Sequence, residues 1–480
     1  MTKGDLGKYV CLSHCWGSAG SKGMLRTTRD NFLELIQHIP WSRIPRTFRD
    51  AINVTRALGI EYIWIDSICI VQDDLKDWES QAAKMHKIYE NSHVTIGATS
   101  ASGPNGGLFL RQSSGAFQET GITASGAHFS MVGHKIWRHP MHYHAEDLPQ
   151  GRSWPLLGRA WVFQERLLSP RFLHFTKNEL IWECNKESLC ECGDSRLESM
   201  SMKPGNHEAL TSKTKENAVR GWHLMTSSYC SLKLSFESDK LPALSGLAAK
   251  MAAVRPGAQY LAGLWSDSID RDLLWHVQDW KHRGEAVRRP AQWRAPTWSW
   301  VSLDAHIMYP DAETSTRLYQ SIHGRTSPAT GDVWGQVASG TLTICGTLFP
   351  ARMEFKGSDD IDIVLEGQGV VASSNSDWTY EHQRWLHLDT VNNTSFLHEL
   401  ASNSTLFCLR VARLHESQRG NRETEYTLIL CLRHNMTEYE RVGIIAQGIW
   451  ANDASMAADF WASTANPFAV GGEQRTIDIV

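Results

Sequence analysis

The sequence predicts an α/β fold: a parallel sheet flanked by helices, followed by a mixed α+β region and a β-rich C-terminal region. Between residue 9 and about residue 100, strand-like and helix-like patterns alternate, which is typical of a parallel sheet covered on both faces. From about residue 335, short apolar runs separated by glycine, asparagine and charged turns indicate antiparallel strands of a small sandwich or barrel. A chain of 480 residues is too long for one compact core. We therefore expect domains at 1–110, 111–335 and 336–480.

The first strand and the first two helices are predicted from local patterns. The run YVCLS at 9–13 is short and apolar and ends in a polar turn, as a buried strand does. Residues 27–39 place apolar side chains at helical spacing behind threonines that can cap a helix. Residues 45–59 give a stronger helix signal, because Pro45 stands at its start and Gly59 stands where a C-cap glycine belongs.

The next strands frame the expected binding edge of the sheet. The run EYIWIDSICIV at 61–71 is nearly continuous in β-branched and aromatic residues, which predicts a strand buried on both faces. A helix around Trp78 and a strand within 92–101 follow. Ligands of such sheets bind at the carboxyl ends of the strands. These ends are the segments 13–17, 66–74 and 99–107, and their polar residues are our first site candidates.

Composition excludes several classes of protein. The net charge is −4 with Lys and Arg scattered along the chain, so nucleic-acid binding has no electrostatic support. The first residues lack a signal-peptide pattern, and no apolar run approaches the roughly 20 residues of a membrane span. We expect a cytoplasmic protein with neither nucleic-acid nor membrane partners. The 20 tryptophans suit a large core or an aromatic-lined pocket.

Two clusters raise the question of metal binding. Cys184, Cys190 and Cys192 are close in sequence but lack a complementary pair of ligands nearby, and the histidine-rich stretch RHPMHYH at 138–144 has no cysteine or second acidic ligand on a defined element. We therefore expect no metal and no other cofactor. The polar residues 197–218 predict a linker or loop.

Residues 158–184 predict a helix that leads into strands, with Gln164, Glu165 and Arg166 embedded in apolar sequence. Buried charges must be paired. A structural ion pair and a role in a functional site are therefore both open for Glu165 and Arg166.

Successive blocks of the sequence resemble the fungal heterokaryon-incompatibility (HET) domain family. In order along the chain, the blocks are residues 9–17, 44–78, 85–101, 158–184, 238–248, 260–265 and 295–300. The resemblance implies a fungal source and a first sheet related to Toll/interleukin-receptor (TIR) domains. Family members act in non-self recognition and cell death, and the TIR kinship implies NAD cleavage by a helix glutamate.

One departure from the family pattern bears on that chemistry. The family helix reads Trp, two variable residues and then Glu, whereas here the last place holds Gln81 and the nearest carboxylate is Glu79. Two positions correspond to about 200° of helix rotation, so Glu79 cannot replace a glutamate at 81. A neutral amide supplies no charge to an oxocarbenium-like cation. NAD cleavage would then need a carboxylate such as Asp66, Asp73 or Asp74.

Two main functions follow. One is a TIR-like effector that cleaves NAD, with Asp66, Glu79 and the 13–17 turn at its site. The other is a HET scaffold reused as a stand-alone, cofactor-independent enzyme of fungal specialised metabolism, a cyclase, isomerase or pericyclase that holds an apolar small molecule by shape and hydrogen bonding. Gln81 favours the second. So does the chain's start eight residues before the first block, because family members often carry extra N-terminal or fused assembly regions. A non-catalytic recognition protein is a third interpretation.

The preferred function identifies two groups of residues. The predicted catalytic residues are His14, Asp66, Gln72, Glu79, Gln81 and Gln164. The predicted substrate-binding residues are Ser13, Trp16, Arg166, Trp298 and Trp300. Packing is the alternative for the tryptophans, and capping of the following loop is the alternative for Asp66. We expect a small-molecule substrate, and homo-oligomerisation stays open.

Overall fold

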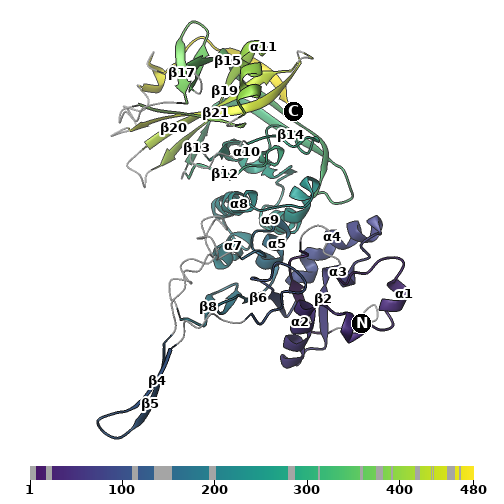
Figure 1. Cartoon of the computed structure of the whole chain (residues 1–480). Coiled ribbons are helices and arrows are strands. Elements are labelled where there is room, and N and C mark those ends of the chain that lie inside the picture. The colour runs from purple at the N-terminus through teal and green to yellow at the C-terminus, as the bar shows by residue number, and fades with distance from the viewer. Residues whose placement is uncertain are drawn as a thin grey trace. The chain divides into compact units, whose positions relative to one another are not determined.

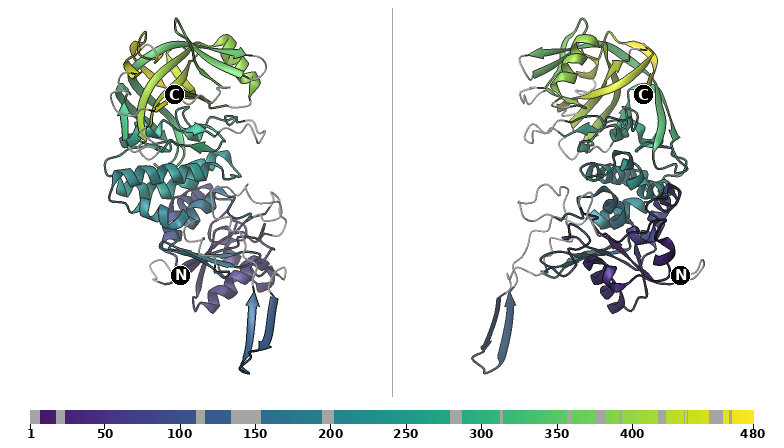
Figure 2. Two further views of the ribbon diagram at one scale, coloured as in Figure 1. Left: turned by 90° about the vertical axis from the view of Figure 1, so that its left-hand side faces the viewer. Right: turned by 45° about the vertical axis from the view of Figure 1, so that its right-hand side comes forward.

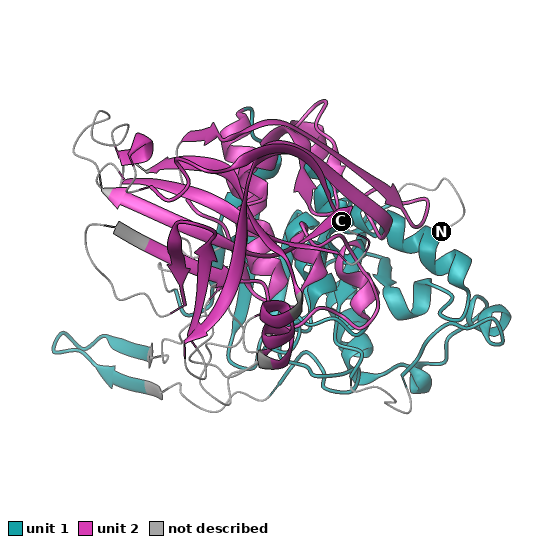
Figure 3. Ribbon diagram, turned by 90° about the horizontal axis from the view of Figure 1, so that it is seen from above, with its two compact units in different colours: residues 1–213, 232–235, 242–251 teal, residues 214–231, 236–241, 252–480 magenta. Residues whose placement is uncertain are grey.

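The chain divides into two compact units (Figure 3). The computed structural model describes residues 7–17, 24–110, 117–133, 154–193, 202–278, 287–311, 314–356, 360–374, 382–390, 393–416, 422–433, 435, 437–450, 460–463 and 466–480. Unit 1 is Met1–Lys213, Leu232–Ser235 and Pro242–Met251, and unit 2 is Thr214–Ser231, Phe236–Leu241 and Ala252–Val480. The division at residues 110 and 335 stays a prediction.

Unit 1 contains a six-stranded mixed sheet in the order β2-β1-β3-β6-β7-β8 (Figure 1). Its strands are β1 (Tyr9–Ser13), β2 (Tyr62–Ile65), β3 (Val94–Gly97), β6 (Arg171–Phe175), β7 (Leu180–Cys184) and β8 (Ser188–Cys190). The strands β2, β1, β3 and β6 run parallel, and β7 and β8 add an antiparallel edge. The predicted parallel sheet is confirmed, with its carboxyl ends at Ser13, Ile65 and Gly97.

Helices connect several of these strands or follow the last of them. In unit 1 they are α1 (Phe32–Leu35), η1 (Trp41–Arg43), α2 (Arg46–Ala57), α3 (Asp66–Cys69), α4 (Leu75–Glu90), α5 (Ala160–Leu168), α7 (Met202–Leu210), η4 (Pro242–Leu244) and most of α9 (Ser245–Val254). As predicted, Pro45 is the N-cap of α2, and Gly59 follows its end with φ +70°. A separate hairpin is formed by β4 (Phe117–Ile122) and β5 (His128–Gly133).

The core of unit 1 lies between α2 and the sheet. Val10 and Leu12 of β1, Phe48 and Ala51 of α2 and Ile96 of β3 are all buried in one apolar cluster. Each large side chain buried in this way contributes roughly 1.5–3 kcal/mol. Packing of these β1 side chains against α2 therefore fixes the position of the strand ends.

Three sequence predictions for unit 1 were wrong. The helix expected at 27–39 is only α1, Phe32–Leu35, and its N-cap is Asn31 instead of a threonine. The strand expected at 61–71 ends at Ile65, and Asp66–Cys69 is the short helix α3. Because β2 is an edge strand, Tyr62 is also 38% exposed rather than buried. The linker expected at 197–218 contains α7, in which Lys203 is buried and its amine donates to the carbonyls of Arg166, Leu167 and Ser169 at the end of α5. This amine caps α5, an interaction that a polar sequence pattern does not reveal.

Unit 2 is dominated by a large sheet of mostly antiparallel strands. They are β13 (Thr314–Arg317), β14 (Tyr319–Pro328), β15 (Val337–Lys356), β16 (Asp360–Leu365), β17 (Gly369–Ser373), β18 (His382–Leu388), β19 (Leu406–Glu416), β20 (Arg422–Leu432), β21 (Glu438–Trp450) and β22 (Glu473–Ile479). Because β15 pairs with both β22 and β19, the strands β19-β20-β21-β22-β15 close into a ring. Figure 2 shows these strands curving around one another. Leu406, Cys408, Ile429 and Ile445 are buried in the adjoining core, so the predicted β-rich C-terminal region is confirmed.

The remaining elements of unit 2 are short, apart from α8 and α11. They are α8 (Lys215–Cys230), η3 (Glu237–Lys240), β9 (Tyr260–Leu261), β10 (Leu264–Trp265), η5 (Ser266–Ser268), α10 (Ile269–Asp272), β11 (His276–Val277), η6 (Trp300–Ser302), β12 (Ile307–Met308) and α11 (Thr394–Asn403). Among the described residues, no helix is both long and apolar enough to cross a lipid bilayer.

Candidate functional site

The carboxyl ends of β1 and β2 bring three predicted site residues together. His14 and Trp16 follow β1, and Asp66 follows β2 as the first residue of α3. Trp16 Nε1 donates to Asp66 Oδ2 at 2.9 Å, and the Ser67 backbone N–H donates to Asp66 Oδ1 at 2.6 Å. The carboxylate is thereby fixed through both oxygens while its side chain stays 21% exposed. It is a positioned anion that solvent and a ligand can reach.

His14 lies behind this carboxylate. Its side chain is 1% exposed, and its Nδ1 lies 3.6 Å from Asp66 Oδ1, too far for a hydrogen bond. Neither ring nitrogen has a hydrogen-bond partner, and the ring meets Phe48 edge-on at 4.8 Å. Burial lowers the pKa of His14, although the nearby Asp66 carboxylate partly opposes this. The imidazole is therefore neutral at neutral pH and can exchange a proton only at a cost.

A second polar group lies at the same strand end. Ser13 Oγ donates to Glu165 Oε2 at 2.5 Å, and both residues are buried. Burial raises the pKa of Glu165 to about 7, while the hydrogen bonds from Ser13 and Tyr89 and the charge of Arg159 oppose the rise. Arg159 also donates to the His14 carbonyl at 3.1 Å. A carboxyl group that titrates near neutral pH beside these partners has the property expected of a proton-transfer group.

Gln72 joins the Asp66 group through the backbone. Its amide nitrogen donates to the carbonyls of Asp66 and Ile70, at 3.1 Å in each case. It therefore fixes the turn that leads from α3 toward α4.

On helix α4, Gln81 and Glu79 lie in different surroundings. Gln81 is half-buried, and its Nε2 donates to Asp77 Oδ1 at 3.0 Å. Asp77 Oδ2 in turn accepts from the Val71 backbone N–H at 2.9 Å. Glu79 is exposed. Position 81 thus contributes an amide that is tied to its own helix.

Gln164 and Arg166 flank Glu165 on α5 but bond elsewhere in unit 1. Gln164 Oε1 accepts from the Gly246 N–H at 3.0 Å, and its Nε2 has no partner although the residue is buried. Arg166 makes a two-point contact with Glu183, at 2.6 and 2.7 Å, and Glu183 Oε2 also lies 2.9 Å from His174 Nε2. Burial favours the protonated acid, but Arg166 holds the pKa of Glu183 well below its usual value. The structural ion pair that the sequence left open for Arg166 is present.

Trp298 and Trp300 belong to unit 2, where both are fully buried. The Trp298 carbonyl accepts from Trp275 Nε1 at 2.9 Å, and Trp300 Nε1 donates to the Gly263 carbonyl at 3.3 Å. These contacts favour the packing interpretation of both residues, and their role as pocket walls stays a prediction.

Unit 2 has a cleft of its own. Its volume is about 370 Å³, and it lies beside Trp293, which is 55% exposed. Its charged lining residues are Arg289, Arg294, Arg433, Glu438 and Glu440. The mixed charges fit a polar ligand, but the described lining includes no histidine or cysteine, so we place the candidate catalytic site in unit 1.

Sequence reasoning missed part of the unit 1 site. Tyr89 and Arg159 were not predicted, and Glu165 was left open between a structural pair and a functional role. The one signal for Glu165 was a carboxylate within an apolar helix, where it needs a partner. That partner, Ser13, is distant in sequence. The histidine-rich stretch at 138–144, considered above for metal binding, lies outside the described residues.

Comparison with known proteins agrees with the resemblance. Residues 9–165 match the family model described as Heterokaryon incompatibility protein (HET). No curated protein and no solved structure matches the chain. The matched range runs from the first residue of β1 to Glu165 and therefore contains His14, Asp66 and Gln81.

Proposed function

We propose that unit 1, in which residues 9–165 match the HET family model, is a cofactor-independent acid–base enzyme. Its substrate is an apolar small molecule of fungal specialised metabolism, and its reaction is an isomerisation or cyclisation. The observation that carries the proposal is Asp66, a partly exposed carboxylate fixed by Trp16 and backed by the neutral, unpartnered His14.

In this proposal Asp66 is the catalytic residue. Its carboxylate removes a proton from the substrate and returns it at another atom, so the product has the same composition as the substrate. Trp16 holds Asp66 Oδ2 and offers an aromatic face to an apolar substrate. Because fixed groups need no rearrangement during proton transfer, such positioning lowers the barrier.

His14 and Glu165 act behind Asp66 as positioning residues. The buried imidazole and the Glu165 carboxyl group are both close enough to Asp66 for its charge to influence their pKa values. Neutral His14, and Glu165 when it is protonated, add no second negative charge beside the Asp66 carboxylate.

NAD cleavage is the second candidate, and Asp66 is the observation that favours it. A carboxylate beside an aromatic ring could stabilise an oxocarbenium-like ribosyl cation. The family resemblance implies that the sheet is related to TIR domains, and this relationship also favours NAD cleavage. Against it stands α4, where the family position is an amide bonded to Asp77.

The proposal is tested with the purified chain and fractionated fungal metabolite extracts. We expect one or more compounds to be converted into products of identical mass, detected by liquid chromatography and mass spectrometry. Asp66→Asn should abolish the conversion, whereas the exposed control Glu79→Gln should retain it. Conversion that survives in Asp66→Asn would remove Asp66 from the mechanism, and a product of different mass would overturn the reaction class.

A further inference from the structure

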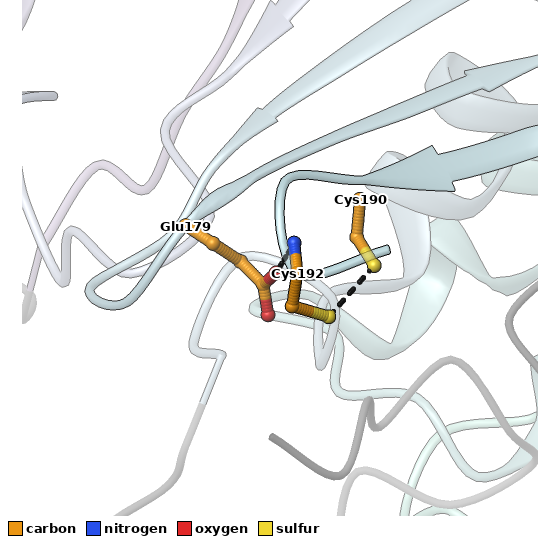
Figure 4. A group of neighbouring side chains, drawn as sticks. All are labelled: Glu179, Cys190 and Cys192. Carbon is orange, nitrogen blue, oxygen red and sulfur yellow. Dashed lines mark hydrogen bonds between the residues drawn. The ribbon is translucent and has the colours of Figure 1, made fainter. Parts of the chain in front are cut away.

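The far edge of the unit 1 sheet brings two thiols and a carboxylate together (Figure 4). Glu179 immediately precedes β7, Cys190 ends β8, and Cys192 lies in the turn after it. One ligand atom from each residue lies within 4.8 Å of the other two. The Sγ atoms of Cys190 and Cys192 are 2.9 Å apart, and Glu179 Oε2 accepts from the Cys192 N–H at 3.1 Å.

Strand pairing and backbone hydrogen bonds hold these three residues in place. Ile181 of β7 pairs with Cys190 of β8, which places the residue before β7 beside the end of β8. The turn that returns Cys192 to this position is closed by the Gly193 N–H, which donates to the Cys190 carbonyl at 3.1 Å. Gly193 has φ +69°, a conformation that glycine adopts at little cost.

Glu179 is fixed from the other side. Its carbonyl accepts from the Thr176 hydroxyl at 2.6 Å, within the turn that joins β6 to β7. The residue is only 7% exposed. The carboxylate therefore reaches the two thiols from a rigid hairpin rather than from a solvated loop.

We propose that Glu179, Cys190 and Cys192 bind a zinc ion. Thiolates are soft ligands that select Zn²⁺ over Mg²⁺ or Ca²⁺, and a carboxylate oxygen is an accepted third ligand. Bonds of about 2.3 Å to sulfur and about 2.1 Å to oxygen in a tetrahedron place ligand atoms roughly 3.5–3.8 Å apart. Here the two Sγ atoms are 2.9 Å apart, and all three ligand atoms lie within 4.8 Å of one another. Small side-chain rotations would therefore bring these distances to the tetrahedral values. A water molecule takes the fourth position.

From the sequence alone we expect no metal, and the proposed ligands also differ from the cysteine cluster that sequence spacing groups together. Three cysteines are near one another in sequence, but Cys184 is not a member of the group, and its place is taken by Glu179. Binding replaces the thiol protons, so affinity falls as the pH falls. The site does not depend on the chemistry proposed for Asp66.

The test is titration of the reduced, metal-stripped full chain with Co²⁺, which reports thiolate ligation through a charge-transfer band in the near ultraviolet. We expect one Co²⁺ per chain, displaced by Zn²⁺. Cys190→Ser and Cys192→Ser should abolish the band, and Glu179→Gln should weaken binding by about tenfold or more. The matched control Cys184→Ser should bind as the unmodified chain does.

Folding of each variant is checked by circular dichroism, and Glu179→Gln keeps both thiols in case a cysteine variant unfolds. No saturable band in the reduced unmodified chain would overturn the site. So would full binding by Cys190→Ser or Glu179→Gln, or an equal loss in Cys184→Ser, because the ligands would then be others. A stable disulfide between Cys190 and Cys192 that persists under reducing conditions would also overturn it.

Discussion

Ser13 Oγ donates a 2.5 Å hydrogen bond to Glu165 Oε2, which joins the end of β1 to α5 across 152 residues of sequence. The bond is buried at both ends. It links the first and last parts of the HET domain and places a carboxyl group, with a pKa raised to about 7 by burial, beneath the carboxyl edge of the sheet. Four predictions follow from this group and its neighbours.

Glu165→Gln should flatten the pH dependence of stability. The pKa of Glu165 in the folded state, about 7, lies above its ordinary value of 4.5. The stability contributed by this group is therefore fully present below about pH 4.5 and is lost as the pH rises through 7. We measure the free energy of unfolding with urea at pH 5 and at pH 8. The difference between the two pH values should be smaller in the variant than in the unmodified chain, by on the order of 1–3 kcal/mol. The control Glu79→Gln should keep the original slope, and an unchanged slope in Glu165→Gln would contradict the assignment.

Asp66→Asn should lower the pKa of His14 further. Burial already lowers it, and the Asp66 carboxylate is the main influence that raises it. Because the folded-state pKa is depressed, the stability contributed by neutral His14 is present above pH 6.5 and is lost as the pH falls through the folded-state value. Nuclear magnetic resonance of ring-labelled histidine measures the titration directly. A His14 pKa at or above the ordinary histidine value would refute the arrangement. So would a His14 pKa that is the same in the unmodified chain and in Asp66→Asn.

Arg166→Ala should destabilise the chain strongly. The substitution leaves Glu183 buried without its two-point partner, and removing one member of a buried pair typically costs about 3–5 kcal/mol. Arg166→Lys should also be costly, because an ammonium group cannot make both contacts. Thermal unfolding measures both. The control is Arg171→Ala, at an exposed residue of β6; equal melting temperatures for the two alanine variants would argue against the ion pair.

Gln81→Glu should destabilise α4 in a salt-dependent manner. The new carboxylate would face Asp77, which now accepts a hydrogen bond from Gln81 at 3.0 Å. Loss of that bond costs about 0.5–1.5 kcal/mol, and repulsion four residues apart on a helix adds roughly 0.2–0.5 kcal/mol. Gln81→Met loses the bond without gaining charge. Urea unfolding should therefore show that added salt recovers part of the loss in Gln81→Glu and none in Gln81→Met; identical salt responses would speak against the contact.

The sequence predicted the parallel sheet because β1, α2 and β3 carry strong local periodicities. It also placed His14, Trp16 and Asp66 just after strands, although the strand expected at 61–71 ends at Ile65. It failed where a distant partner decides the role of a residue. The hydrogen bond to Glu165 comes from the other end of the HET domain, and Lys203 caps a helix 37 residues earlier in the chain. Neither partner leaves a periodic pattern in the sequence.

The proposed zinc site also includes a residue that spacing in the sequence does not group with the cysteines. Spacing in the sequence groups Cys190 and Cys192 with Cys184, whereas the hairpins bring Glu179 to the two thiols. A carboxylate beside a turn has many ordinary roles. Only the register of β7 against β8 distinguishes this one.

The most direct test of the central claim is incubation of the purified, folded chain with NAD at high protein concentration, with nicotinamide release followed by chromatography. We predict no release above a protein-free control for the unmodified chain, because α4 supplies an amide at position 81 and because we propose that Asp66 transfers protons on another substrate. Release that either Asp66→Asn or Glu79→Gln abolishes would contradict this account and assign the site to NAD cleavage.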